Sequence, residues 1–467
     1  MAPEMQQTMN FEPSRNRFKD NLNSGKFPIL IEAPIPERNI DVAGQTARLK
    51  ELENTILEIK DYPVSLAILD QGEDDIWQGV EYASALPQEN RDLHVVYLSG
   101  KDSVSEECFD RIQVAKNAGF FNIVSVSGYT PKNVTAKSCR SRSFTESITM
   151  LDELNNDERF FSGCVINPYQ YTFPTLFAQY LKLDNKLNHN ANFVITECGW
   201  DMLKLQSLAW HLWERKTYVP IIVRLMFLTP EKVERIVAGQ YPGIKISQEY
   251  KQVLQNSLKF SKTQFEAVQY RSLELMAAGC RLLGFAGVQI SGTELPIQAK
   301  TACERISYAL KEFTDFNQWL NEYNSYIGYA EMAPFDNDFR LYDRMLHRDY
   351  PQDNPPECNV PIDITHNTSG EHRYKLKKFL FSNAKKQKSS QGYLLKKLLC
   401  NCQTCNSCQL PDTEYICPQE CPKGFRHGIC GGVKANGTCE LSNLECVYCK
   451  IVKLAARHNC LQKISEL

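Results

Sequence analysis

Eight short apolar runs alternate with helical stretches between residues 28 and 291, and this alternation restricts the fold more than any other feature. The runs are Ile29–Ile31, Val64–Leu69, Leu93–Leu98, Asn122–Val126, Gly163–Asn167, Asn192–Thr196, Val219–Val223 and Gly284–Ile290. Strands that are apolar on both faces are typical of a parallel sheet covered by helices on both sides. Eight repeats of strand and helix predict a (β/α)8 TIM barrel. The alternative is an open doubly wound sheet, but no glycine fingerprint follows the first run.

Changes in composition along the sequence divide the chain into four predicted parts. Residues 1–27 form a polar lead, 28–345 the α/β barrel, 346–398 a linker with a basic segment, and 399–467 a small cysteine-rich metal-binding domain. From Glu371 to Lys397 the chain carries nine Lys or Arg residues and one acid. Such a run is typical of a solvated helix or linker, or of a docking surface for an acidic protein. Nucleic acid is disfavoured because aromatic residues are sparse there.

The overall composition predicts an ordinary soluble protein. Hydrophobic residues make up 43% of the chain and the formal net charge is −2. The first residues lack the apolar core of a signal peptide, and no run is apolar enough for a transmembrane helix. We therefore expect a cytoplasmic protein with no nucleic acid partner and no membrane insertion.

Cysteine is concentrated at one end, because 11 of the 18 cysteines lie between Cys400 and Cys460. In a reducing cytosol, clustered thiols indicate metal ligands before disulfides. The run Cys402-x2-Cys405-x2-Cys408 has the spacing of three ferredoxin ligands, but no fourth cysteine follows at the ferredoxin spacing. Zinc, an iron–sulfur cluster and a metal-free or disulfide-bonded state therefore stay open. The predicted ligands are Cys402, Cys405, Cys408, Cys417, Cys421, Cys430, Cys439 and Cys446.

The same segment contains four short motifs that combine cysteine with glycine, proline or a charged residue. They are Tyr415-Ile-Cys-Pro418, Cys421-Pro-Lys423, Gly428-x-Cys-Gly-Gly432 and Gly437-x-Cys-Glu440. In these motifs the segment resembles the C-terminal domain of long methylenetetrahydrofolate reductase-type proteins. The resemblance implies a module that binds zinc or an iron–sulfur cluster and is associated with a reductase barrel.

Parts of the barrel resemble the same family, notably Leu30-Ile-Glu-Ala-Pro34 and Asn192–Asp201. The resemblance implies a flavin-dependent oxidoreductase, with FAD or FMN, that reduces 5,10-methylenetetrahydrofolate to 5-methyltetrahydrofolate in one-carbon and methionine metabolism. It assigns catalytic roles to Glu32, as general acid, and to Glu197, at the position of a substrate-contacting Gln. It also assigns flavin binding to Gly128 and Tyr129 beside the ring and to Lys186 at the phosphates.

Two residues depart from the family pattern. Tyr129 stands where the family has an Asp, and Glu197, when ionised, only accepts hydrogen bonds, whereas a Gln amide also donates them. If Glu32 and Glu197 lie close together, their repulsion favours a proton on one of them. These changes favour an alternative, a repurposed non-catalytic barrel that serves as an electron-transfer or assembly subunit. A third hypothesis is an oxidoreductase for another pterin or methyl carrier. A redox protein that donates electrons is the candidate partner.

Overall fold

The computed structural model describes most of the 467 residues. The described residues are 15–33, 35–36, 41–70, 78–130, 134–241, 243–329, 339, 341–342, 373–384, 392–403, 405, 407–434, 436–442 and 444–464.

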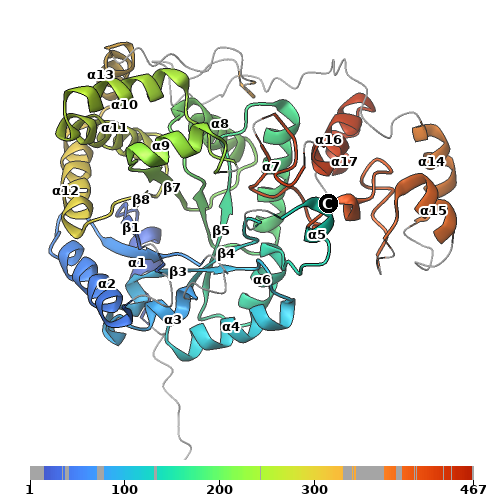
Figure 1. The fold of residues 1–467 in the computed structure, drawn as a ribbon, viewed down its shortest axis with the longest axis horizontal. Coiled ribbons are helices and arrows are strands. Elements are labelled where there is room, and N and C mark those ends of the chain that lie inside the picture. The colour runs from blue at the N-terminus through green and yellow to red at the C-terminus, as the bar shows by residue number, and fades with distance from the viewer. Residues whose placement is uncertain are drawn as a thin grey trace, which may run out of the picture.

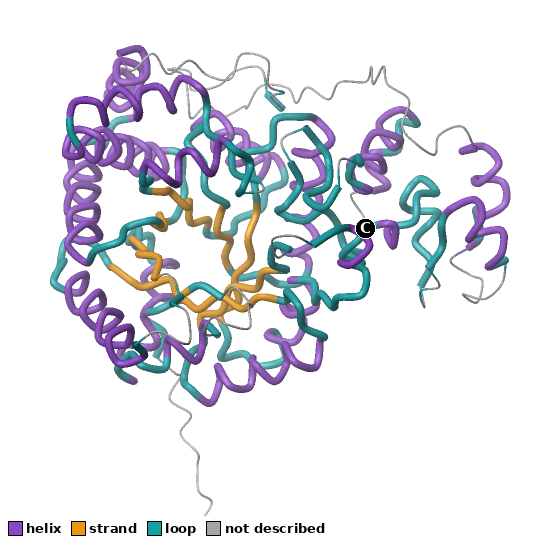
Figure 2. The backbone as a smooth tube through the Cα atoms, in the orientation of Figure 1, coloured by secondary structure: helices purple, strands orange, loops and turns teal. Residues whose placement is uncertain are grey.

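Eight parallel strands form a closed barrel (Figures 1 and 2). Each strand pairs with the next, and the ring closes where Ile29 of the first strand lies opposite Val288 of the last. The strands are β1 (Ile29–Ala33), β2 (Val64–Ile68), β3 (Val95–Ser99), β4 (Asn122–Val126), β5 (Phe161–Ile166), β6 (Phe193–Thr196), β7 (Ile221–Met226) and β8 (Gly287–Ser291). The predicted (β/α)8 barrel is thus confirmed, and the cysteine-rich region follows it.

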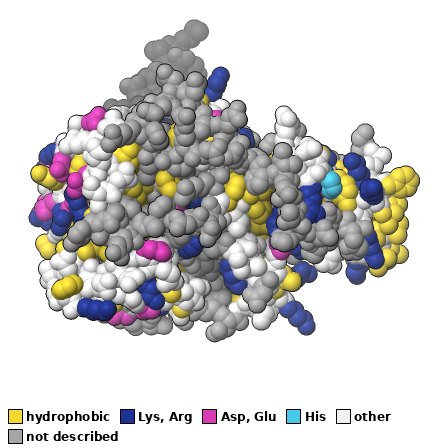
Figure 3. Space-filling view, turned by 90° about the horizontal axis from the view of Figure 1, so that it is seen from above, with side chains coloured by type: hydrophobic (Ala, Val, Ile, Leu, Met, Phe, Trp, Pro, Cys, Tyr) yellow, Lys and Arg dark blue, Asp and Glu magenta, His cyan; other side chains and the backbone are white. Residues whose placement is uncertain are grey.

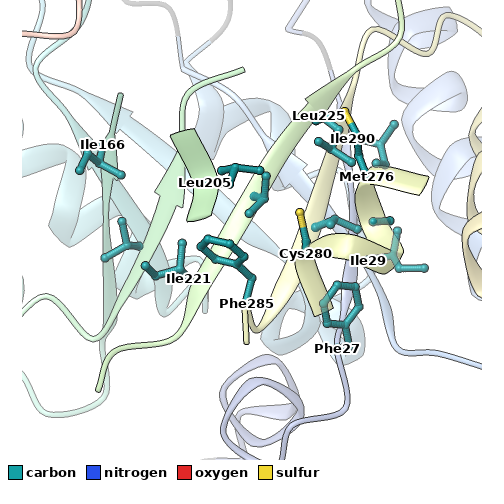
Figure 4. Packing of buried hydrophobic residues seen from close by; sticks show 14 of the residues in the cluster. Phe27, Ile29, Ile166, Leu205, Ile221, Leu225, Met276, Cys280, Phe285 and Ile290 are labelled. Atoms are coloured by element: carbon teal, nitrogen blue, oxygen red, sulfur yellow. The ribbon is translucent and has the colours of Figure 1, made fainter. Parts of the chain in front are cut away.

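Helices surround the strands, and apolar side chains fill the layer between them. Figure 4 shows Met276 and Cys280 of α11 packed with Ile29 and Ile290 of the adjoining strands β1 and β8. The described helices of this part are α2 (Val42–Leu57), α3 (Gly79–Ala83), α4 (Ser105–Asn117), α5 (Ala136–Cys139), α6 (Ser147–Leu154), α7 (Phe173–Asn188), α8 (Met202–Glu214), α9 (Pro230–Val237), α10 (Gln248–Phe260), α11 (Lys262–Leu282), α12 (Pro296–Glu312) and α13 (Phe316–Tyr329), with the 3-10 helix η1 (Gln88–Leu93).

A short helix, α1 (Arg17–Asn23), covers the amino end of the barrel. Phe18 is fully buried, and its ring centroid lies 6.1 Å from that of Phe161 and 5.4 Å from that of Phe193, the first residues of β5 and β6. Asn16, which caps the helix, donates to Asn122 at the start of β4 over 2.7 Å. The opposite end, at the carboxyl ends of the strands, is therefore the end available for a ligand.

Strand β7 extends three residues beyond the predicted run, which ended at Val223. The extension includes Arg224, whose charge disguised the strand in the sequence. A charged side chain is tolerated on a strand with both faces covered only where it has charged partners. Its partners lie at the barrel mouth and are described below.

The cysteine module, residues 400–460, is mostly loop and packs on one flank of the barrel beside α7 (Figure 1). Its helix α16 (Val447–Arg457) lies on α7, where Ile451, Val452 and Ala455 pack with Phe173 and Ala178. The other helices of the C-terminal part are α14 (Tyr374–Phe381), α15 (Tyr393–Cys400), η4 (Pro418–Glu420) and α17 (Leu461–Ile464).

One carboxylate of the barrel anchors the module. Glu146, at the start of α6, is buried and accepts from Lys182 Nζ over 2.8 Å, from the Arg426 backbone N–H over 2.6 Å and from His427 Nδ1 over 3.1 Å. Burial opposes its charge, but Lys182 and His427 outweigh burial and lower the pKa of Glu146 to about 2. The module is thus attached through an ionised group in an apolar interface.

In the described part of the chain, no helix has both the length and the hydropathy needed to cross a membrane. The domain limits drawn from the sequence stay a prediction, and most of the predicted linker lies outside the described residues.

We predict that Glu146→Gln weakens the attachment of the module. Because the folded pKa of about 2 is below the unfolded value, the ionised carboxylate contributes stability that is complete above about pH 4.5 and is lost as the pH falls towards 2. That contribution is on the order of 3 kcal/mol. Urea unfolding followed at several acidic pH values should show that the variant is less stable at neutral pH and less sensitive to acid.

Glu158→Gln, an exposed carboxylate just beyond α6, is the matched control and should behave as the unmodified chain does. An acid-unfolding curve that Glu146→Gln leaves unchanged would contradict the anchoring role.

Candidate functional site

The carboxyl ends of four strands bring polar side chains together inside the barrel mouth. They are Glu32 of β1, Glu197 directly after β6, Arg224 of β7 and Gln289 of β8. Glu32, Glu197 and Gln289 are buried, and Arg224 is largely so. Catalytic groups of barrel enzymes come from this end of the strands, so the two predicted catalytic carboxylates lie where that chemistry is expected.

Arg224 bridges the two carboxylates. Its Nε donates to Glu32 Oε2 over 2.8 Å, its Nη2 lies 2.6 Å from the same oxygen, and its Nη1 donates to Glu197 Oε1 over 2.9 Å. Burial opposes the charge of the guanidinium, but Cys198, Glu32 and Glu197 raise the pKa of Arg224 well above its ordinary value. The expected repulsion between Glu32 and Glu197 is therefore offset, because a cation lies between them.

A second chain of hydrogen bonds reaches the same oxygen of Glu32. Tyr97 Oη donates to Gln289 Oε1 over 2.9 Å, and Gln289 Nε2 donates to Glu32 Oε2 over 3.1 Å. Sequence reasoning missed both Arg224 and Gln289. The available signal was a polar side chain inside a run that is otherwise apolar and covered on both faces.

Tyr129 connects Glu197 with the rim of the mouth. Its hydroxyl donates to Glu197 Oε2 over 2.5 Å, although its side chain is 38% exposed. Desolvation of the hydroxyl, the charge of Glu197 and this hydrogen bond raise the pKa of Tyr129 well above its ordinary value, so the phenol stays neutral. Gly128 precedes it with a φ of 76°, and an added β-carbon would lie 2.6 Å from Ser99 Oγ. Only glycine fits that turn.

Lys186 lies apart from these residues. It is on α7, is buried, and donates from Nζ to the Val165 carbonyl over 2.5 Å. Burial lowers the pKa of Lys186 to about 8. The ammonium is held between α7 and β5 beside Cys164, not with Tyr129 at the mouth, so its predicted contact with flavin phosphates stays a prediction.

The cysteine module contacts the rim beside Tyr129. Lys423 Nζ donates to the Gly128 carbonyl over 3.0 Å and also pairs with the buried carboxylate of Glu440. Glu440 Oε2 accepts from Thr130 Oγ1 over 3.0 Å. The segment Gly128–Thr130 is therefore held between the barrel's acidic residues and the module.

A glycine contact completes this junction. A β-carbon on Gly243, which has a φ of +77°, would lie 2.3 Å from the Gly431 carbonyl oxygen. A β-carbon on Gly431 would lie 3.8 Å from the Tyr129 hydroxyl. Gly431 directly follows Cys430, so this predicted ligand is one residue away from the glycine that lies beside the Tyr129 hydroxyl, which is hydrogen-bonded to Glu197.

Four predicted ligands line one cavity of about 190 Å³, and they are Cys421, Cys430, Cys439 and Cys446. Lys423 and Glu440 also line this cavity. Burial, and then the nearby Cys446, raise the pKa of Cys421 to about 12. These thiols thus form one group.

The other four predicted ligands belong to a second group. Burial, and then Cys402 and Cys405, raise the pKa of Cys417 to about 12. Cys408 and Cys417 contribute to an apolar cluster with Cys400, whose pKa is raised to about 11, chiefly by burial. Both groups are rich in sulfur, the ligand type that zinc and iron–sulfur clusters use in proteins. Within the described residues, no three Cys, His, Asp or Glu side chains converge as ligands of one ion. His427 and His458 pair instead with Glu146 and Glu414.

We predict that Arg224→Gln destabilises the barrel because it leaves two buried carboxylates without their cation. The free energy of unfolding should fall by about 3–5 kcal/mol near neutral pH. Protonation of an unpaired carboxylate relieves the penalty, so the loss should shrink as the pH is lowered towards about 5. Urea unfolding at two pH values measures both effects.

Arg48→Gln, on the exposed surface of α2, serves as the control, and the double variant Arg224→Gln with Glu197→Gln should recover part of the loss. A pH-independent loss for Arg224→Gln would show that its charge is not what matters.

Comparison with known proteins gives two kinds of result. The chain matches no curated protein. One matching solved structure is an uncharacterized protein from Clostridium thermocellum, described as binding two copies of 5-methyl-5,6,7,8-tetrahydrofolic acid. It is 15% identical with a TM-score of 0.46, and the match covers 62% of this chain and 99% of that one. Another is a putative dihydrodipicolinate synthetase from Pseudomonas aeruginosa, 14% identical with a TM-score of 0.28 and the same coverage.

A family model matches the end of the chain. It is described as methylene-tetrahydrofolate reductase C terminal and covers residues 381–467, which include all eight predicted metal ligands. The family resemblance drawn from the cysteine motifs is thereby confirmed for this part. Residues 381–467 belong to the methylene-tetrahydrofolate reductase C-terminal family.

Proposed function

We propose that the chain is a methylenetetrahydrofolate reductase-type oxidoreductase that reduces 5,10-methylenetetrahydrofolate to 5-methyltetrahydrofolate at the barrel mouth, within one-carbon and methionine metabolism. One observation carries the proposal: a module of the matching family lies against the rim of a barrel mouth with paired carboxylates. The contact is close, because Gly431 lies beside the Tyr129 hydroxyl, which donates to Glu197.

The two carboxylates differ in the oxygens that they leave available. Both oxygens of Glu197 are engaged, Oε1 by Arg224 and by the Cys198 backbone N–H, and Oε2 by Tyr129. Glu32 differs, because both Arg224 and Gln289 donate to its Oε2. Among the described residues, no hydrogen bond engages Glu32 Oε1. Glu32 is therefore the better candidate for proton transfer, and Glu197 serves as a fixed acceptor.

The reaction requires a proton on the nitrogen of the methylene bridge before the bridge opens. The iminium that results then takes up a hydride, whose two electrons come from a separate reductant. A neutral Glu32 can accept from Arg224 through Oε2 and donate its proton from Oε1, so Arg224 does not have to move. Arg224 and Gln289 then act by holding the carboxyl group in one orientation. Glu32 then transfers the proton and Arg224 orients it, which explains why a buried arginine lies beside the proposed acid.

The three residues predicted to bind flavin do not lie together. Gly128 and Tyr129 are at the rim under the module, Lys186 is behind β5, and the Tyr129 hydroxyl is already bound to Glu197. These three residues do not fit one flavin site, so no step of the reaction is assigned to flavin here. A flavin in this barrel would need other residues at its phosphates.

The metal centres of the module are part of the proposal. One centre would use Cys421, Cys430, Cys439 and Cys446, and the other Cys402, Cys405, Cys408 and Cys417. The first is supported by the shared cavity, where the buried ammonium of Lys423 would offset thiolate charge. Zinc would brace the module, whereas an iron–sulfur cluster would also carry electrons.

One observation favours the alternative, a repurposed barrel that acts as an electron-transfer or assembly subunit. Glu197 is closed off by Tyr129 and Arg224, and Tyr129 is fixed by the module on its other side. In that case the barrel mouth would be a structural joint and would bind no folate.

We predict that Glu32→Gln abolishes turnover of 5,10-methylenetetrahydrofolate, because the amide carries no transferable acidic proton. A loss of about 100-fold or more is expected for a general acid. Folate affinity should change little, since Gln keeps an oxygen for Arg224. Product formation and calorimetric folate binding are measured on the same preparations, whose absorption spectra also report bound flavin.

Glu51→Gln, on exposed α2, is the control. Turnover by Glu32→Gln at the original rate would exclude Glu32 as the acid, and absence of folate binding by the unmodified chain would favour the alternative function.

We also predict two separable metal centres. Replacing Cys421 and Cys446 with Ser should remove one, and replacing Cys405 and Cys408 with Ala the other, because each pair takes two ligands from one group. Elemental analysis should show that each double variant loses about half of the metal.

Cys303→Ala, in α12, is the matched control and should retain all the metal. If both double variants keep their full metal content, the assignment of ligands into two groups is wrong.

A further inference from the structure

Helices α14 and α15 carry the same eight-residue pattern. Tyr374-Lys-Leu-Lys-Lys-Phe-Leu-Phe381 and Tyr393-Leu-Leu-Lys-Lys-Leu-Leu-Cys400 are identical at five positions, the Tyr, the first Leu, both central Lys and the second Leu. The fourth and eighth residues of each helix are buried. Lys377 and Phe381 are buried on α14, as Lys396 and Cys400 are on α15.

The outward residues of the two helices are unusually apolar. Phe379 is 82% exposed, Leu394 80% and Leu398 75%, and Leu376 and Leu395 are about half exposed. Figure 3 shows hydrophobic side chains gathered at the end of the molecule that carries these helices. An apolar group of this kind on a soluble protein usually marks a binding surface. We call these five residues, with the basic residues named next, the α14–α15 face.

Positive charge accompanies the apolar side chains. Arg373, Lys375, Lys378 and Lys397 are exposed on the same two helices, and the sequence has no Asp or Glu between residues 372 and 411. Lysines around an apolar centre attract an acidic surface over a distance and steer its approach.

The α14–α15 face lies directly over the second cysteine group. Phe381 and Cys400, on the inner sides of the helices, pack with Leu410, Tyr415 and Cys417. A partner on the outside of the helices would thus be separated from this group by a single helical layer.

We propose that the α14–α15 face is the docking site of an acidic redox protein. This inference rests on the proposed function only in that the second cysteine group holds a redox centre. Two eight-residue helices offer a small contact area, as is typical of transient redox encounters, which bury less than about 1,200 Å². A redox protein is favoured over a membrane surface because the α14–α15 face lies directly over the second cysteine group.

The test measures binding of a purified acidic [4Fe–4S] ferredoxin to the immobilised full-length chain. Binding should weaken about tenfold or more between about 50 and 300 mM salt, because the attraction is between exposed charges. The variant Lys375→Glu with Lys378→Glu and Lys397→Glu should weaken binding about tenfold at low salt. Phe379→Ser with Leu398→Ser should also weaken it, but with no change in the salt dependence.

The control reverses three exposed lysines of the barrel, Lys50→Glu, Lys259→Glu and Lys262→Glu, and should bind as the unmodified chain does. Metal content and circular dichroism check that all variants are folded. Glu32→Gln should bind the ferredoxin normally, so failure of the folate proposal and failure of docking give different results.

Three outcomes would overturn the docking proposal. They are no ferredoxin binding at low salt, equal weakening in the control, and unaltered binding in the Lys375, Lys378 and Lys397 variant. The unmodified chain is also mixed with phosphatidylglycerol vesicles. Sedimentation with them that is lost in the same variant, without ferredoxin binding, would assign the face to a membrane.

Discussion

The pairing of β8 with β1 closes the sheet, and the chemistry of the barrel depends on that closure. Glu32 and Gln289 are 257 positions apart in the sequence, yet they are hydrogen-bonded because their strands adjoin in the ring. Arg224 of β7 reaches both carboxylates because β6, which Glu197 follows, adjoins β7 on one side, and on the other side only β8 separates β7 from β1, which carries Glu32. Without the β8–β1 pairing Glu32 would lie far from Arg224 and would carry its own cost of burial, whereas Glu197 would keep its place beside Arg224 on the paired strands β6 and β7.

The ion network and the cysteine module meet at the end of β4. There Tyr129 turns its hydroxyl towards Glu197, while Gly128 and Thr130 contact Lys423 and Glu440. A metal centre bound by Cys430 and its neighbours would therefore be connected to the barrel interior through short, buried polar contacts. Groups in such networks respond to one another's charge more strongly than exposed groups do.

Sequence reasoning succeeded where the pattern was local. Alternating apolar runs identified the barrel, and the spacing of cysteines and glycines identified the family of the C-terminal module, now matched over residues 381–467. It failed for Arg224, because an arginine inside an apolar strand is explained only by two carboxylates that come from distant strands. The division of the cysteines into two groups was equally hidden, since neighbours along the chain, Cys417 and Cys421, belong to different groups.

The closeness of Gly243 and Gly431 has a consequence for how such chains can diverge. The barrel cannot add even a methyl group at Gly243 without pushing the main chain at Gly431 away, whereas a β-carbon at Gly431 would meet the Tyr129 hydroxyl at an ordinary contact distance. The barrel and the cysteine module are thus fitted to each other here, main chain against main chain. Any other cysteine module carried on this barrel would need a main-chain path that likewise leaves room for Gly243 and for the Tyr129 hydroxyl.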